Sequence, residues 1–155
     1  MEIRFAVSED IPGILSLLQQ VGQVHHLGRP DIFRAGAQKY DAPAVQALLD
    51  KPESPILVAA ENGAVLGYCF CFVKQYQGDP VIADHKELYI DDLCIDENCR
   101  GQGVGKALYL AACDHARSIG CYNVTLNVWD CNPGAMAFYK AMGMQPQKTG
   151  METVL

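Results

Sequence analysis

Residues 88–117 read LYIDDLCIDENCRGQGVGKALYLAACDHAR, and this stretch decides the fold. It predicts an apolar strand with two adjacent acids, Asp91 and Asp92, then a loop with three glycines in five residues, then an amphipathic helix. Glycine lets the backbone turn sharply and expose N–H groups, and the positive end of the helix dipole favours an anion there. The stretch therefore predicts a strand–loop–helix unit that binds a phosphorylated ligand where the helix begins.

Two common phosphate loops do not fit these residues. A Walker A loop would need a glycine at Arg100 and a hydroxyl side chain at Ala107. The Rossmann pattern Gly-x-Gly-x-x-Gly places either Lys106 or Leu108 at its third glycine, depending on the register. Both classes of nucleotide loop are thereby excluded.

The composition limits the classes of partner. A chain of 155 residues, 50% hydrophobic and 19% charged, predicts one globular domain over residues 1–155. A net charge of −6 opposes nucleic-acid binding and attracts cations such as amines. No apolar run reaches the roughly 20 residues of a membrane span, so we expect a cytoplasmic protein with no membrane partner. Because of the negative net charge, we also expect no nucleic-acid partner. The sequence leaves a homodimer open.

The seven cysteines do not suggest a disulfide framework or a metal site. Their number is odd and no two of them form a Cys-x-x-Cys pair, so we expect reduced thiols and no bound metal. Cys69 and Cys71 alternate within an apolar strand pattern, which places both thiols on one face as small hydrophobic groups.

The remaining segments alternate between strand and helix patterns. Ile11, Ile14 and Leu18 predict a helix to about Gly22, and the pair Asn62-Gly63 predicts a type I′ hairpin turn. The full order predicted from these patterns is a strand at 3–7, a helix at 11–22, a loop or broken helix at 24–34, a helix opened by Asp41, strands at 56–60 and 65–73, a strand from 88, a helix at 104–119, a strand at 124–128, a helix after Asn132-Pro133 and a last strand within 149–155. This is an α+β order, with one parallel β-α-β crossover at the centre of a mixed sheet.

The pattern Arg100-x-x-Gly103-x-Gly105 after an apolar strand resembles the acyl-CoA pyrophosphate loop of the GNAT superfamily of N-acetyltransferases. The element order is similar to the GNAT fold across nearly the whole chain. The resemblance implies a sheet of six to seven strands flanked by helices, with a splayed central strand pair and acetyl-CoA as the acyl donor. It also implies a set of residues that contact the pantetheine arm or the phosphates of CoA: Leu93, Cys94, Ile95, Arg100, Gly101, Gln102, Gly103, Val104, Gly105 and Lys106.

A second motif lies in residues 132–144, where Asn132-Pro133 opens a helix that carries Tyr139. It resembles the family motif in which the asparagine contacts the CoA arm and the tyrosine faces the thioester sulfur. Each residue also has a structural interpretation, since Asn132 is a good helix N-cap and Tyr139 has the spacing of a core residue.

The acids suggest how an amine would be activated. About one lysine-like amine in a thousand is unprotonated at neutral pH, so a base must take the proton. Strand alternation predicts two sets of residues, with Asp92 and Cys94 on one face and, on the other, Tyr89, Asp91, Leu93 and Ile95. The stretch resembles polyamine acetyltransferases, which carry their acid at the position of Asp91. We expect Asp91 to be the base, with Asp92 second and a water relay left open.

The other steps have weaker signals. Backbone N–H groups near Cys94 are expected to stabilise the oxyanion. Proton transfer from Tyr139 to a thiolate is uphill by roughly 2 kcal/mol, which favours a hydrogen bond to sulfur over full protonation.

The acceptor is inferred from charge and from the resemblance. The acidic composition and the acid pair favour a small cationic amine, while acetylation of a protein N-terminus or lysine remains an alternative. A catalytically inactive CoA-binding sensor and a nucleotide-binding interaction domain also remain open. In the family the segment after the first strand forms the acceptor wall, which implies substrate contacts from His25, His26, Arg29 and Asp31.

Overall fold

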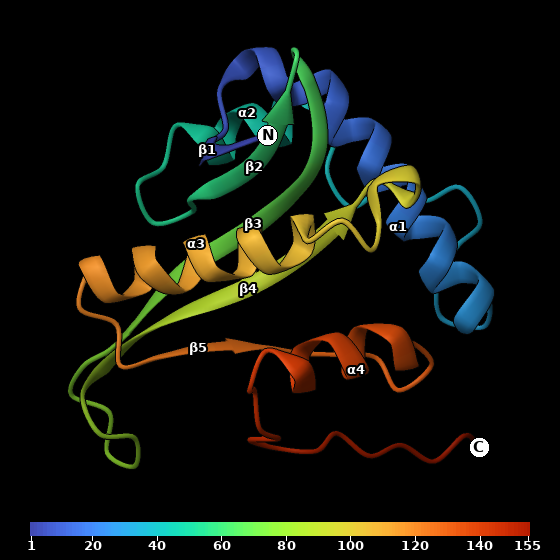
Figure 1. Cartoon of the computed structure of the whole chain (residues 1–155). Helices are drawn as coiled ribbons and strands as arrows, with labels where there is room; N and C mark the ends of the chain where they lie inside the picture. Colours follow the sequence, from blue (N-terminus) through green and yellow to red (C-terminus); the bar gives the residue numbers. More distant parts are fainter.

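Strand β4 (His85–Ile95) carries the two adjacent acids and joins the two parts of the sheet. In the computed structural model, which describes residues 1–155, β4 pairs antiparallel with β3 (Ala64–Tyr76) and parallel with β5 (Asn123–Leu126) (Figure 1). β2 (Ile56–Glu61) and β1 (Glu2–Phe5) extend the antiparallel part, and the order across the sheet is β1-β2-β3-β4-β5. The predicted mixed sheet with one parallel crossover is confirmed.

Helices cover both faces of the sheet (Figure 1). Helix α3 (Val104–Ser118) makes the crossover from β4 to β5 and packs on one face over a cluster of 11 buried residues. Helices α1 (Ile11–Gly28) and α2 (Ala42–Leu49) pack on the other face over a cluster of 9 buried residues. Helix α4 (Pro133–Ala141) follows β5 and adds aromatic side chains to the α3 cluster. None of these helices is long and apolar enough to cross a membrane.

Several local predictions are confirmed. The hairpin between β2 and β3 turns at Asn62 and Gly63, whose φ angles of 51° and 80° are the two positive values of a type I′ turn. Asp41 caps α2, with Oδ1 accepting from the Ala44 N–H at 2.9 Å. Both Cys69 and Cys71 lie buried in the α3 cluster, so their thiols share one face.

Helix α1 is longer than predicted and ends at Gly28 instead of about Gly22. Gly22 is needed for packing and does not end the helix, because a Cβ there would lie 2.3 Å from the carbonyl oxygen of Ala37. The extra turns place His25 and His26 at the C-terminal end of α1, so the prediction of a loop or broken helix at these positions was wrong.

The predicted last strand within 149–155 was also wrong, and the sheet has five strands instead of six to seven. Every residue from 145 to 155 is exposed. Strand propensity mainly reflects packing on a half-buried surface, so a segment that buries no side chain gains little from pairing. The segment is attached instead through Glu152, which forms an ion pair with Arg29.

Candidate active site

The acids of β4 lie at an irregularity in the sheet. The β3–β4 ladder pairs Asp92 with Phe70 and Ile90 with Cys71, so Asp91 is the extra residue of a β-bulge. A bulge leaves its extra residue unpaired and bends the strand, a feature that is frequent next to active sites.

The bulge changes the face to which Asp91 belongs. Ile90 and Leu93 both pack in the α3 cluster although they are three residues apart, whereas Cys94 packs in the α1/α2 cluster. Asp91 and Asp92 both contact tyrosines on the α1/α2 side. The alternation predicted for Asp92 and Cys94 is confirmed, but the prediction that Asp91 shares a face with Leu93 was wrong, because the extra residue resets the alternation.

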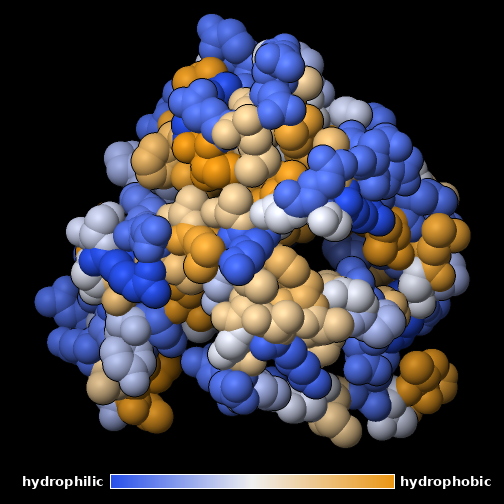
Figure 2. All heavy atoms as spheres, viewed as in Figure 1, coloured by the Kyte–Doolittle hydropathy of each residue, from blue (hydrophilic) through white to orange (hydrophobic).

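The predicted splay of the central strand pair is present. Pairing between β4 and β5 ends at Ile90 and Leu126, while β4 continues to Ile95. The Asp96 N–H donates to the Leu66 carbonyl at 2.9 Å, and antiparallel ladder bonds recur at every second residue. The backbone groups of Leu93 and Ile95 therefore face the open side, where an extended chain can pair with them. In the same region, Figure 2 shows the surface hollowed between the first turn of α3 and helix α4.

The glycine-rich loop presents free donors at the start of α3. Gly101 and Gly103 have φ angles of 75° and 82°, and the N–H groups of residues 101–106 donate to no backbone carbonyl. The first N–H groups of a helix lack an intrahelical partner and together favour an anion. Arg100 and Lys106 are exposed on either side of these donors. This arrangement fits a diphosphate, as the motif predicts.

Gly105 brings the loop, β4 and α4 together. A Cβ at Gly105 would lie 3.4 Å from the Phe138 ring and 3.5 Å from Ile95 Cγ1. Asn132 caps α4, with Oδ1 accepting from the Ala135 N–H at 3.1 Å. The amide of Asn132 retains two N–H donors for a ligand while its oxygen serves the helix.

The two acids have different partners. Asp91 Oδ2 accepts a hydrogen bond from the Tyr40 hydroxyl at 2.8 Å and lies 2.8 Å from Lys39 Nζ. Asp92 Oδ2 accepts from the Tyr68 hydroxyl at 2.7 Å. Burial raises the pKa of Asp92, and the Tyr68 hydrogen bond and the Lys39 charge oppose that shift.

Tyr139 lies on α4 with its ring against the α3 cluster, 5.1 Å from the Phe138 ring between centroids. Burial raises the pKa of Tyr139, and the nearby Cys69 and Asp92 raise it further. The phenol therefore stays protonated at neutral pH and can donate a hydrogen bond.

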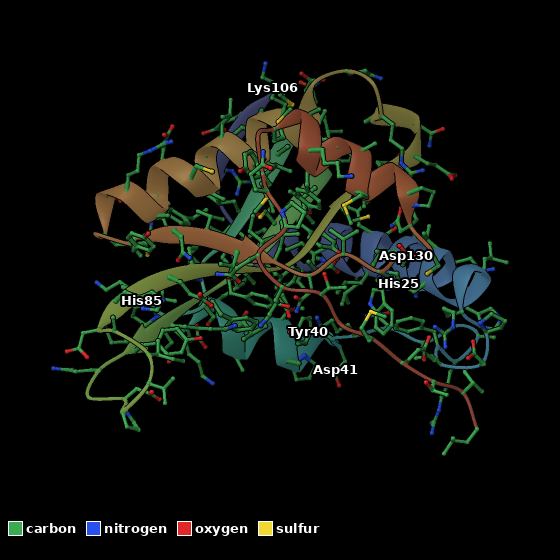
Figure 3. All side chains as sticks on the ribbon, turned by 90° about the horizontal axis from the view of Figure 1, so that it is seen from below. His25, Tyr40, Asp41, His85, Lys106 and Asp130 are labelled. Atoms are coloured by element: carbon green, nitrogen blue, oxygen red, sulfur yellow. The ribbon has the colours of Figure 1, made fainter.

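An aromatic cluster joins the end of α1 to the segments around residues 33 and 129. The His25 ring stacks on Phe33 with centroids 4.9 Å apart, and Phe33 meets Trp129 edge-on at 4.9 Å. A charge on His25 also lowers the pKa of Asp92. Figure 3 shows His25 and Tyr40 on the side of the molecule away from Lys106. Of the four predicted acceptor-wall residues, His25 is thus the one that belongs to this aromatic cluster.

The other three acceptor-wall residues are engaged within the protein. His26 Nδ1 lies 2.7 Å from the Phe33 carbonyl oxygen. Arg29 pairs with Asp31 at 2.8 Å and with Glu152 of the C-terminal segment. These contacts hold the segment after α1 in place.

The sequence analysis missed Lys39, Tyr40 and Tyr68, the residues that contact the acids directly. No local pattern marks these three. Tyr68 lies in an apolar strand, and Tyr40 reaches an acid 51 positions away.

Comparison with known proteins assigns the family. A model described as the acetyltransferase (GNAT) family matches residues 23–144. The chain is 35% identical over 155 aligned positions to thialysine N-epsilon-acetyltransferase of Bos taurus, covering 92% of this chain and 83% of that one. A 63-residue segment is 36% identical to glucosamine 6-phosphate N-acetyltransferase of Trypanosoma brucei brucei and spans 41% of each protein.

A solved structure agrees with these relatives. The crystal structure of a mutant protein from Bacillus halodurans superposes with a TM-score of 0.95 at 32% identity, covering 100% of this chain and 99% of that one. The family model spans most of the chain, including the glycine-rich loop, both acids and Tyr139. The chain therefore belongs to the acetyltransferase (GNAT) family and is an N-acetyltransferase.

Proposed function

We propose that the protein transfers the acetyl group of acetyl-CoA to the primary amine of a small cationic acceptor, by direct attack in a ternary complex. The observation that carries this proposal is the position of Asp91 and Asp92, at the point where β4 separates from β5. The bovine relative is named for thialysine, and the net charge of −6 attracts a cationic amine.

Free donors of the chain support the proposed CoA site. The diphosphate binds the N–H groups of residues 101–106 with Arg100 and Lys106 nearby. The pantetheine arm pairs with the backbone of residues 93–95 along the open side of β4, within reach of the Asn132 amide.

Asp91 is the proposed base for the acceptor amine, with Asp92 as the second candidate. Asp91 lies on the bulge at the mouth of the open segment and keeps 13% of its side chain exposed, so an ammonium can reach it. The Tyr40 hydroxyl holds the carboxylate in position. Asp92 lies behind it on the Tyr68 hydroxyl, where its charge attracts the same cation.

Two further groups stabilise charge during the reaction. The Leu93 N–H faces the open side of β4, so it is the proposed oxyanion donor; removing such a donor in other enzymes costs about 10²–10³ in rate. Tyr139 stays protonated and donates a hydrogen bond to the departing thiolate.

A free-thiol release assay with acetyl-CoA over a panel of diamines, amino acids, aminoglycosides and peptides tests the proposal. We expect release with small cationic amines, and we expect Asp91→Asn to lower kcat by about 10²–10⁴ because a positioned base contributes that factor. Asp84→Asn, in the exposed loop between β3 and β4, is the control and should keep the activity. Release only with peptides would point to a protein acceptor, and CoA binding without release to a sensor module.

A further inference from the structure

The acid pair already holds a primary ammonium group that belongs to the chain itself. Lys39 Nζ lies 2.8 Å from Asp91 Oδ2, and the Lys39 side chain remains 46% exposed. Its charge also acts on Asp92, whose pKa it lowers against the effect of burial. Lys39 is the only lysine or arginine paired with either acid.

The backbone around Lys39 is fixed while its side chain can move. Gln38 Nε2 donates to the Tyr40 carbonyl at 2.6 Å, and the Tyr40 ring stacks on Phe70 with centroids 5.3 Å apart. Asp41 then caps α2. A lysine ammonium lies at the end of a flexible four-carbon stem. The segment therefore brings a mobile primary amine to Asp91 from a fixed point.

An external acceptor must arrive at the same carboxylate. It enters as an ammonium, and the base must remove its proton before it can attack. Lys39 carries the same chemical group at the same atom. We propose that Lys39 is a self-acetylation site, whose Nζ takes the acetyl group from acetyl-CoA when no external amine occupies the site. This inference rests on the proposed function and adds to it a modification site at the acceptor position.

The transfer balances without any further reactant. The Lys39 ammonium gives one proton to the Asp91 carboxylate, and the free electron pair on Nζ attacks the thioester carbonyl carbon. A nitrogen–carbon bond forms, the carbon–sulfur bond breaks, and the electron pair leaves with sulfur. The second Nζ proton passes to the thiolate, so the products are N-acetyl-lysine and CoA thiol. Asp91 then releases its proton to water.

Lys74 of β3 provides a matched control for Lys39, because both lysines form an ion pair with an acid of β4. It forms an ion pair with Glu87 of β4 at 3.5 Å and has a similar side-chain exposure of 42%. Glu87 lies where β4 is paired with β5, outside the open segment. A lysine beside an acid is thus present at both places, but only the acid paired with Lys39 lies beyond the part of β4 that pairs with β5.

The experiment is site-resolved mass spectrometry of the full chain after incubation with acetyl-CoA alone. We expect Lys39 to gain an acetyl group at least about tenfold faster than Lys74. Asp91→Asn should reduce the Lys39 rate to that of Lys74, and Lys39→Arg should remove the modification because a guanidinium stays protonated. Saturating diamine should slow Lys39 acetylation by about tenfold or more, since both amines need Asp91.

Acetylation of Lys39 no faster than that of Lys74, or a rate unchanged by Asp91→Asn, would overturn the inference. Thiol release with the amine panel in the same preparation separates the two proposals. Release with amines but no preferential Lys39 acetylation leaves the proposed function intact and removes the self-acetylation site. If neither thiol release with amines nor preferential Lys39 acetylation is seen, the proposed function and the self-acetylation site are both ruled out.

Discussion

Asp91 and Asp92 are adjacent in the sequence but differ in their surroundings. Asp91 has a lysine ammonium and a tyrosine hydroxyl as partners, whereas Asp92 has the Tyr68 hydroxyl and a buried position that raises its pKa. Removal from water disfavours the charged form of a carboxyl group, so a buried carboxyl group keeps its proton to a higher pH. The two side chains can therefore take different roles, one in proton removal and one in setting the charge of the site.

The raised pKa of Asp92 gives a stability prediction. An aspartate with a pKa of 3.8 when unfolded and a higher value when folded binds more protons in the folded state. The free energy of unfolding that Asp92 contributes therefore falls as pH rises from 3.8 through the folded pKa. We expect Asp92→Asn to gain stability relative to the wild type over that window and to level off above it. Urea denaturation of both proteins between about pH 4 and about pH 8 measures this difference. A loss of stability of Asp92→Asn relative to the wild type as pH rises would contradict the prediction.

Tyr139 gives a kinetic prediction at the same scale. Its raised pKa keeps the phenol neutral, so its proposed contribution is a hydrogen bond that forms as charge develops on sulfur. We expect Tyr139→Phe to lower kcat by roughly 10²-fold or less with little change in CoA affinity. Tyr122→Phe, an 82% exposed tyrosine, is the control. Steady-state kinetics and calorimetry with CoA are the measurements, and an unchanged kcat would remove Tyr139 from the mechanism.

At the scale of elements, the loop before α3 depends on backbone conformation more than on side chains. Gly103 is the N-cap of α3 with a φ of 82°, and nothing lies within 4 Å of the place where its Cβ would be. A side chain would fit there, but a residue other than glycine is strained in the left-handed region. The loop therefore uses glycine for the direction of its N–H groups.

Gly103→Ala and Gly63→Ala form a matched pair for testing this loop. Gly63 has a φ of 80° in the β2–β3 turn and equally open surroundings. We expect both substitutions to lower the free energy of unfolding by about 1 kcal/mol, because both place alanine in the left-handed region. Only Gly103→Ala should weaken CoA binding, since it alone changes the donors at the start of α3. Equal CoA affinity of the two variants, by calorimetry, would show that the phosphates bind elsewhere.

At the scale of the whole molecule, the net charge of −6 would act together with the acid pair on the proposed cationic acceptor. Long-range attraction of this kind raises the association rate and is screened by salt, with a Debye length of about 10 Å at 0.1 M and about 3 Å at 1 M.

This charge predicts a salt dependence that grows with the charge of the acceptor. We expect kcat/KM for a diamine to fall by about tenfold between low salt and about 0.5 M salt, and less for a monoamine. The value of kcat at saturation should change little, because encounter no longer limits the rate. Steady-state kinetics over a salt series measures this, and equal slopes for the two amines would refute steering by charge.

Features that depend on a few neighbouring residues were determined by the sequence itself. The left-handed glycines before α3, the hairpin at Asn62 and Gly63, and the caps Asp41 and Asn132 follow from the conformations that these residue types favour. The order of strands and helices as far as α4 followed from periodicity. The same local rules failed at Gly22, whose packing partner Ala37 lies beyond its own helix.

Only the tertiary structure decided the orientation and the partners of the two acids. The bulge that turns Asp91 toward Tyr40 depends on the pairing of β4 with β3, because one extra residue shifts every side chain after it to the other face. The partners of the acids come from 24 positions away for Tyr68 and 51 for Tyr40. Contacts over such separations form only when the strands and helices pack, and no local preference of the chain encodes them.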